Sequence, residues 1–214
     1  MTAKKYIASF LAFLAIVLCF GSCSGKPPAL EEVKDELISL VEASYEINDV
    51  FFGKGLPTHA RGGEYDTEYR LYEGTSSEFD FYEYVTEDSP YHFIDQIKSA
   101  AEQVYTAEYL NGIYTMAFDG YADENTGSVS TARYLETSGW LMKYAFGEND
   151  SFNILPGKRV YDFETMQIVK PSTSKYLNVE VDSYVEGDEE ATAMSLTLRF
   201  KLTPNGWRLD APTY

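Results

Sequence analysis

Apolar residues recur at intervals of three and four positions along the segment that begins at Leu30. This spacing places one apolar face on a helix and turns that face toward a core. The members of the pattern are Leu30, Val33, Leu37, Leu40, Val41, Ser44, Ile47 and Phe51. Gly53 and Pro57 follow, and they are residues that end helices. The sequence therefore predicts a long helix from Leu30 to just before Gly53.

Two shorter helices are expected further along the chain. The apolar positions Ile94, Ile97, Ala101 and Val104 indicate a second helix, and residues 107–118 indicate a third. Thr106 directly precedes the third helix, where a hydroxyl can accept a hydrogen bond from a free backbone N–H. Thr106 is therefore the predicted N-cap.

Several short segments have the composition of strands, being rich in aromatic or branched residues and bounded by turn residues. They are residues 69–72, 79–85, 132–136, 140–144, 160–163 and 166–169. From residue 177 to residue 202, apolar and polar residues alternate around the acidic segment 186–190, which predicts a long hairpin. Asn205-Gly206 is a strong hairpin signal. The expected fold is an α+β domain, with one long and two short helices packed on a curved antiparallel sheet.

The N-terminus has the order of a secretory signal peptide. Lys4 and Lys5 precede an apolar run over residues 6–20, and small residues come directly before Cys23. The stretch 20–23 resembles a bacterial lipobox, which implies that the Cys23 sulfur is lipidated and anchors the protein to a membrane of the cell envelope. A plain secreted protein or an uncleaved anchor is the alternative. The expected organisation is a signal peptide over residues 1–22, a tether over 23–29 and a single domain over 30–214.

The charge of the chain limits its partners. The whole chain carries a net charge of −17, and removal of residues 1–22 would take two lysines and no acid, giving −19. Such a charge repels phosphates, which argues against nucleic acid as a partner. It favours a cationic protein or cations, or serves solubility alone.

Motifs for catalysis are missing from the sequence. Only Cys19 and Cys23 are cysteines, so a disulfide or Cys-ligated zinc within the mature domain is not expected. The two histidines, His59 and His92, lie beside loops and outside any zinc or nucleophile motif. We expect a non-enzymatic protein without a cofactor or metal. The acidic loop 119–127 offers oxygens that could bind calcium, but it lacks the EF-hand order of ligands, and we expect a helix-exit turn there.

Two groups of residues are candidates for binding a partner. Asp188, Glu189 and Glu190 lie in the predicted hairpin tip, where they form either a solvated turn or an acidic projection that meets a basic groove. Tyr82 and Tyr84 share one face of a strand. Tyrosine is favoured at binding surfaces, so an exposed tyrosine face is one expectation, and a face covered by a second layer is the other.

A family resemblance adds to these expectations. Its residues are Phe51-Phe52-Gly53-Lys54-Gly55-Leu56-Pro57, Phe81-Tyr82-Glu83-Tyr84-Val85, Tyr91, Ile94-Asp95-Gln96-Ile97-Lys98 and Val104-Tyr105-Thr106. In these residues, over about 30–120, the chain resembles the secreted inhibitors of peptidoglycan DL-endopeptidases (the IseA family). The resemblance implies a non-enzymatic protein that occupies the cleft of a cell-wall hydrolase. A lipid anchor would be a departure from the freely secreted form of that family.

The last strands suggest an alternative function. The segment Gly206-Trp207-Arg208-Leu209 resembles the end of cystatin- or NTF2-like folds, which often bind ligands between helix and sheet. The first hypothesis is therefore an envelope-anchored lipoprotein that binds and modulates a cationic peptidoglycan hydrolase. The second is a lipoprotein that binds a small or glycan ligand. The third is an enzyme that uses carboxylates.

Overall fold

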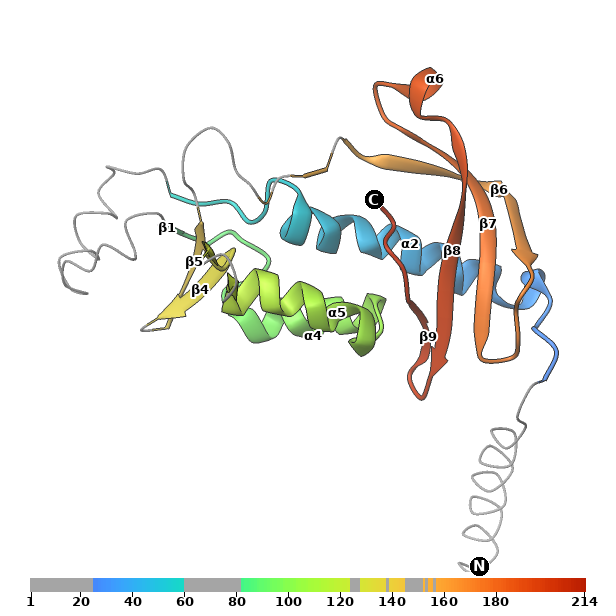
Figure 1. Cartoon of the computed structure of the whole chain (residues 1–214), viewed down its shortest axis with the longest axis horizontal. Coiled ribbons are helices and arrows are strands. Elements are labelled where there is room, and N and C mark those ends of the chain that lie inside the picture. The colour runs from blue at the N-terminus through green and yellow to red at the C-terminus, as the bar shows by residue number, and fades with distance from the viewer. Residues whose placement is uncertain are drawn as a thin grey trace, which may run out of the picture.

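The fold combines helices with antiparallel sheets, so the predicted α+β class is confirmed (Figure 1). The structure is a computed structural model. It describes residues 25–59, 82–123, 128–137, 139–144, 152, 154–155 and 157–214, and for residues 121–123 and 128–130 it gives the backbone elements only. The predicted strand at 69–72, the first part of the strand at 79–85, and Cys23 lie outside the described residues.

The helix predicted from Leu30 is present as α2, which spans Leu30–Phe52. Glu31 and Glu32 lie in its first turn, where carboxylates interact favourably with the helix dipole. The predicted apolar positions, Ser44 among them, are buried apart from Leu30, which packs at the edge of the core. The opposite face exposes mainly acidic residues, as the amphipathic pattern requires.

The second helix is α4, Ile94–Val104, and the third is α5, Ala107–Tyr114. Thr106 is the N-cap of α5, since its Oγ1 accepts a hydrogen bond from Tyr109 N at 3.2 Å. The third helix was expected to continue to residue 118. The chain instead widens into one π-helical turn, η2 (Thr115–Asp119), which ends at Gly120 with φ 71°.

The C-terminal half forms a four-stranded antiparallel sheet in the order β6-β7-β8-β9. The strands are Arg159–Val169, Tyr176–Val185, Met194–Thr203 and Gly206–Leu209. The predicted alternation and both hairpins are confirmed. Residues 160–169, expected as two short strands, form one strand whose register with β7 shifts between Asp162 and Gln167. A bulge therefore lies where the sequence suggested a break between two strands.

The remaining strands form two smaller sheets. A three-stranded antiparallel sheet has the order β1-β5-β4, with strands Tyr82–Tyr84, Trp140–Tyr144 and Tyr134–Thr137. A two-stranded ribbon pairs β2 (Tyr121–Asp123) with β3 (Ser128–Ser130). The strands are thus divided among separate sheets, whereas the sequence suggested one curved sheet.

The main core lies where α2 packs on the large sheet. The buried face of α2 contacts β6 and β9, and α4 packs against α2 and β9 (Figure 1). The start of the described chain is also attached to this sheet, because Ser174 N donates to Gly25 O at 3.0 Å. The segment 25–29 therefore enters the domain beside the loop that joins β6 to β7.

Candidate functional site

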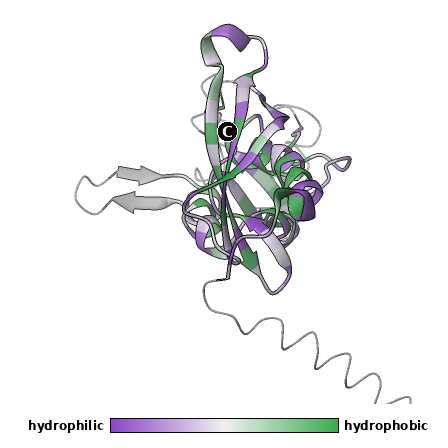
Figure 2. Ribbon diagram, turned by 90° about the vertical axis from the view of Figure 1, so that its right-hand side faces the viewer, coloured by the Kyte–Doolittle hydropathy of each residue, from purple (hydrophilic) through white to green (hydrophobic). Residues whose placement is uncertain are grey.

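The acidic segment 186–190 is the outer end of the β7–β8 hairpin, as the sequence predicted. We call it the acidic tip. It projects beyond the rest of the sheet, together with the short helix α6, Glu189–Thr192 (Figure 1). Figure 2 shows hydrophilic residues at this end of the hairpin. Glu186, Asp188, Glu189 and Glu190 are all exposed, and no lysine or arginine interrupts them.

The backbone of the acidic tip is held by hydrogen bonds. Asp188 N donates to Val185 O at 3.1 Å, and Thr192 N donates to Asp188 O at 3.1 Å. The Thr192 hydroxyl also accepts from Val185 N at 2.7 Å. Gly187 has φ 88°, a conformation that favours glycine. The tip is thus a defined turn, which lowers the entropy lost when it binds a partner.

The carboxylate of Glu189 also takes part in the hydrogen bonds that hold the acidic tip. Gly187 N donates to Glu189 Oε1 at 3.1 Å. Hydrogen bonds from the backbone N–H groups of Glu189 and Gly187 lower the pKa of the Glu189 carboxyl below its usual value. The negative charge of Glu189 is therefore favoured by the turn itself.

Acidic residues continue from the tip onto the outer face of the sheet. Asp162 on β6 lies directly opposite Asp182 on β7, and both are exposed. Like charges in directly opposed positions destabilise a sheet slightly. Within the part of the chain that the structure describes, no group of three His, Cys, Asp or Glu residues could hold a metal ion.

The expectation of an exposed face at Tyr82 and Tyr84 is wrong. The two residues are only 3% and 5% exposed. The Tyr82 hydroxyl donates to Ala132 O at 2.6 Å, and its ring meets Tyr144 edge-on at 5.5 Å. Tyr84 packs edge-on against Trp140 at 6.1 Å. These tyrosines are core residues of the small sheet and offer no binding surface.

The space between helix and sheet, where a ligand was considered, contains a network of polar side chains. We call it the interior network; its members are Ser44, Asn48, Tyr105, Tyr161 and Thr213. Thr213 Oγ1 lies 2.7 Å from Ser44 Oγ, 2.8 Å from Asn48 Nδ2 and 2.9 Å from the Tyr105 hydroxyl.

The rest of the interior network closes around the same residue. The Tyr105 hydroxyl donates to Asn48 Oδ1 at 2.7 Å, and the Tyr161 hydroxyl donates to Thr213 O at 2.9 Å. Burial raises the pKa of Tyr105 to about 12. The segment that follows β9 thus fills the interior with bonded groups. Sequence reasoning missed this network, whose members lie up to 169 positions apart.

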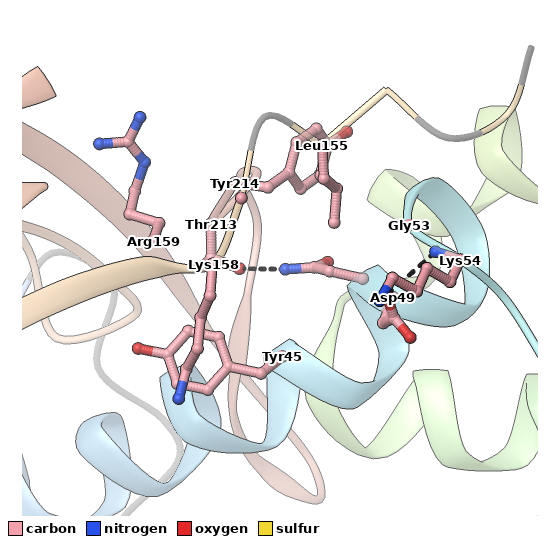
Figure 3. A pocket seen from close by; sticks show the side chains of 11 residues that line it. Tyr45, Asp49, Gly53, Lys54, Leu155, Lys158, Arg159, Thr213 and Tyr214 are labelled. Carbon is pink, nitrogen blue, oxygen red and sulfur yellow. Dashed lines mark hydrogen bonds between the residues drawn. The ribbon is translucent and has the colours of Figure 1, made fainter. Parts of the chain in front are cut away.

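A pocket opens beside this filled interior, between the C-terminal half of α2 and the start of β6 (Figure 3). Its volume is about 500 Å³. The residues that line it are Tyr45, Asn48, Asp49, Gly53, Lys54, Leu155, Gly157, Lys158, Arg159, Thr213 and Tyr214. We call it the cationic pocket, because three basic side chains, Lys54, Lys158 and Arg159, line it together with a single acidic side chain, that of Asp49.

Arg133 is another residue whose role the sequence did not reveal. It is 1% exposed, and its guanidinium donates to Phe51 O at 3.1 Å and to Gly53 O at 2.6 Å. Tyr134 OH donates to Val50 O at 2.8 Å. These bonds satisfy backbone carbonyls at the C-terminal end of α2, which otherwise lack partners. They tie the small sheet to the long helix.

The other candidate residues of the sequence are placed as follows. His59 Nε2 lies 3.0 Å from Glu87 Oε2, and His92 donates its backbone N–H to Gln96 Oε1 at 2.7 Å. Residues 124–127 of the possible calcium loop lie outside the described residues. Within the described chain, no helix has both the length and the apolar character needed to cross a membrane.

The chain matches no protein-family model and no curated protein sequence. The function must therefore be argued from the acidic tip, the interior network and the cationic pocket.

Proposed function

We propose that this protein is an envelope-anchored, non-enzymatic lipoprotein that binds a cationic cell-wall hydrolase and restrains it. The observation that carries the proposal is the acidic tip, an ordered and fully exposed turn with four carboxylates at the end of a long hairpin. The interior network supports the same proposal, because it fills the space that a ligand would occupy in a cystatin- or NTF2-like fold.

Charge complementarity explains how such a tip would act. A concentrated negative charge accelerates encounter with a basic cleft, and an ordered loop then loses little entropy on insertion. The net charge of −17 extends the attraction beyond the tip itself. The hydrolase would be inhibited when the hairpin occupies its substrate cleft.

The direction of the hairpin fits an anchor at Cys23. Gly25 O accepts a hydrogen bond from Ser174 N in the loop before β7. From there β7 runs from Tyr176 to Val185, at the base of the acidic tip. Ten residues of strand span about 30 Å. A lipid on Cys23 would hold the near end of this hairpin at the membrane, so the acidic tip would point away from the membrane toward the wall.

The test compares two charge-neutralised variants in a cell-wall clearance assay with a cationic peptidoglycan endopeptidase. One variant carries Asp188→Asn, Glu189→Gln and Glu190→Gln. The control carries Glu31→Gln, Asp35→Asn and Glu42→Gln, three exposed residues of α2 that give the same change in net charge. We expect the original domain to slow clearance. The tip variant should lose about tenfold in association rate, and the control should lose much less.

Salt provides a second measurement. Raising the ionic strength from about 0.01 M to about 0.15 M shortens the screening length from about 30 Å to about 8 Å, so inhibition should weaken. Unchanged clearance at a large molar excess of the domain, across several endopeptidases, would overturn the proposed function. Equal losses of association rate in the two variants would show that the net charge of the domain drives binding, without a specific role for the acidic tip.

The alternative, a lipoprotein that binds a small or glycan ligand, retains one supporting observation. The cationic pocket has a volume of about 500 Å³, within the range of small-molecule sites. It lies at the edge of the filled interior rather than inside it.

A further inference from the structure

We propose that the cationic pocket binds a small organic anion that carries an apolar or aromatic group. The inference starts from a contrast in charge. The chain has 34 acidic and 17 basic residues, yet the lining of this pocket has three basic side chains and one acidic side chain. The site is distinct from the acidic tip and does not depend on the hydrolase proposal.

Among the described residues, no ion pair neutralises the cations of the pocket. Within the described residues, no carboxylate lies within 4.0 Å of the charged groups of Lys54, Lys158 or Arg159. Other lysines do find carboxylates, as Lys201 does with Glu108 at 2.6 Å. Asp49, which lines the pocket, accepts instead from the backbone N–H of Lys54 at 3.1 Å (Figure 3). The pocket therefore keeps a local positive charge.

One cation also has an unused donor. Arg159 Nη1 donates to Ser183 Oγ at 3.1 Å, while its Nε is buried without an acceptor in the part of the chain that the structure describes. Most buried donors in proteins have a partner. Because Nε is covered by protein and Nη1 is directed to Ser183, Arg159 adds positive charge behind the wall of the pocket, and Lys54 and Lys158 are the cations that a ligand can contact.

The walls of the pocket select for a ligand with an apolar part. Tyr45, Leu155 and Tyr214 lie around it (Figure 3). The ring of Tyr214 is fixed against Phe52, with the ring centroids 4.5 Å apart, and Lys158 Nζ lies 4.7 Å from the centre of the Tyr45 ring. Arg159 and Lys54 lie on opposite sides of the site in Figure 3. A pocket with cationic groups at its edge and aromatic rings between them can bind a ligand that combines an anionic group with an aromatic ring.

The frame of the pocket is rigid. Arg159 is paired with Val185 in the sheet, and Glu186 N donates to Lys158 O at 2.9 Å. Thr213, which also lines the pocket, is held by the interior network. The net negative charge of the whole chain repels large polyanions. The positive charge of this pocket attracts an anion only at short range, because it is screened at larger distances. A small anion is therefore the ligand class that the site favours.

The probe for this site is anilinonaphthalene sulfonate, and its matched control is N-phenylnaphthylamine, which has the same rings without the charge. The pocket variant carries Lys54→Gln and Lys158→Gln. The control variant carries Lys26→Gln and Lys175→Gln, two exposed lysines away from the pocket. Urea unfolding of both variants tests whether the fold is retained. Fluorescence titration at low salt gives each dissociation constant.

We expect the sulfonate to bind more tightly than the neutral probe. The pocket variant should weaken sulfonate binding about tenfold, which is the combined effect of two exposed charges, and the control variant less than twofold. Binding of the neutral probe should not change. Phenylpropionate should displace the sulfonate, and phenylpropanol should not. Equal affinities for the two probes, equal losses in the two variants, or equal displacement by acid and alcohol would each overturn the proposal.

Discussion

The large and small sheets follow the same pattern of alternation but use their faces differently. On β7 the buried positions carry mainly aliphatic residues, and the positions between them carry polar or charged residues, as the sequence suggests. On β1 the buried positions are Tyr82 and Tyr84, and the residue between them is Glu83. Alternation therefore identifies a strand in both sheets, but residue polarity identifies the buried face only in the large one.

Tyrosine explains the difference. It combines a large ring with one polar group, so it can line either a wet surface or a core whose backbone offers an acceptor. Ala132 O is such an acceptor for the Tyr82 hydroxyl. The small sheet also uses polar side chains, from Arg133 and Tyr134, to bond the end of α2. The large sheet is thus held to α2 mainly by apolar burial, and the small sheet partly by hydrogen bonds.

The largest effect should come from the apolar contact between α2 and the large sheet. Leu37 is fully buried in the main core, so Leu37→Ala should lower the free energy of unfolding by about 2–5 kcal/mol. Glu42→Ala, at an exposed position of the same helix, should lower it by about 0.5 kcal/mol or less. Urea unfolding measures both. Similar losses would mean that the face of α2 toward the sheet is wrongly assigned.

A smaller effect should come from the polar connection of the small sheet. Arg133→Met keeps an apolar stem but leaves the carbonyls of Phe51 and Gly53 without their donor. We expect the free energy of unfolding to fall by about 3 kcal/mol, because buried polar groups would lack a partner. Arg199→Met is the control, since Arg199 is exposed and bonds a single carbonyl, Asp210 O. A loss no greater than that of the control would contradict a structural role for Arg133.

The smallest effect should come from one hydroxyl. Tyr82→Phe removes the bond to Ala132 O but keeps the ring, so it should cost about 1 kcal/mol. Tyr176→Phe is the control, because Tyr176 on the large sheet is 48% exposed, and it should cost little. The measurement is the urea midpoint of each variant. A loss at Tyr176 as large as that at Tyr82 would mean that the buried hydroxyl bond adds nothing to the small sheet.

Much of the fold was predictable, because it depends on local patterns. The spacing of apolar residues gave α2, the hydroxyl of Thr106 gave the start of α5, and alternation gave the β7–β8 hairpin. The bulge in β6 and the division into separate sheets were missed. Both depend on which strands become neighbours, and that choice is made by packing across the whole molecule.

The candidate site was predictable only in part. The position of the acidic tip followed from the hairpin around it. The cationic pocket did not, because α2, the start of β6 and the segment after β9 contribute its residues from distant parts of the sequence. The interior network has the same origin, and single hydroxyl or amide residues such as Ser44 and Thr213 carry no sequence signal of their own.

The contact between α2 and β9 has a consequence for the rate of folding. Trp207 N donates to Glu36 Oε1 at 2.9 Å across 171 positions of sequence. Closing so large a loop loses chain entropy before the contact is gained, and proteins dominated by distant contacts fold slowly. The packing of α2 on β9 can form only after residues near 36 and near 207 have met. For the exported lipoprotein proposed above, slow folding would keep the chain unfolded longer and so suit passage through a translocation channel.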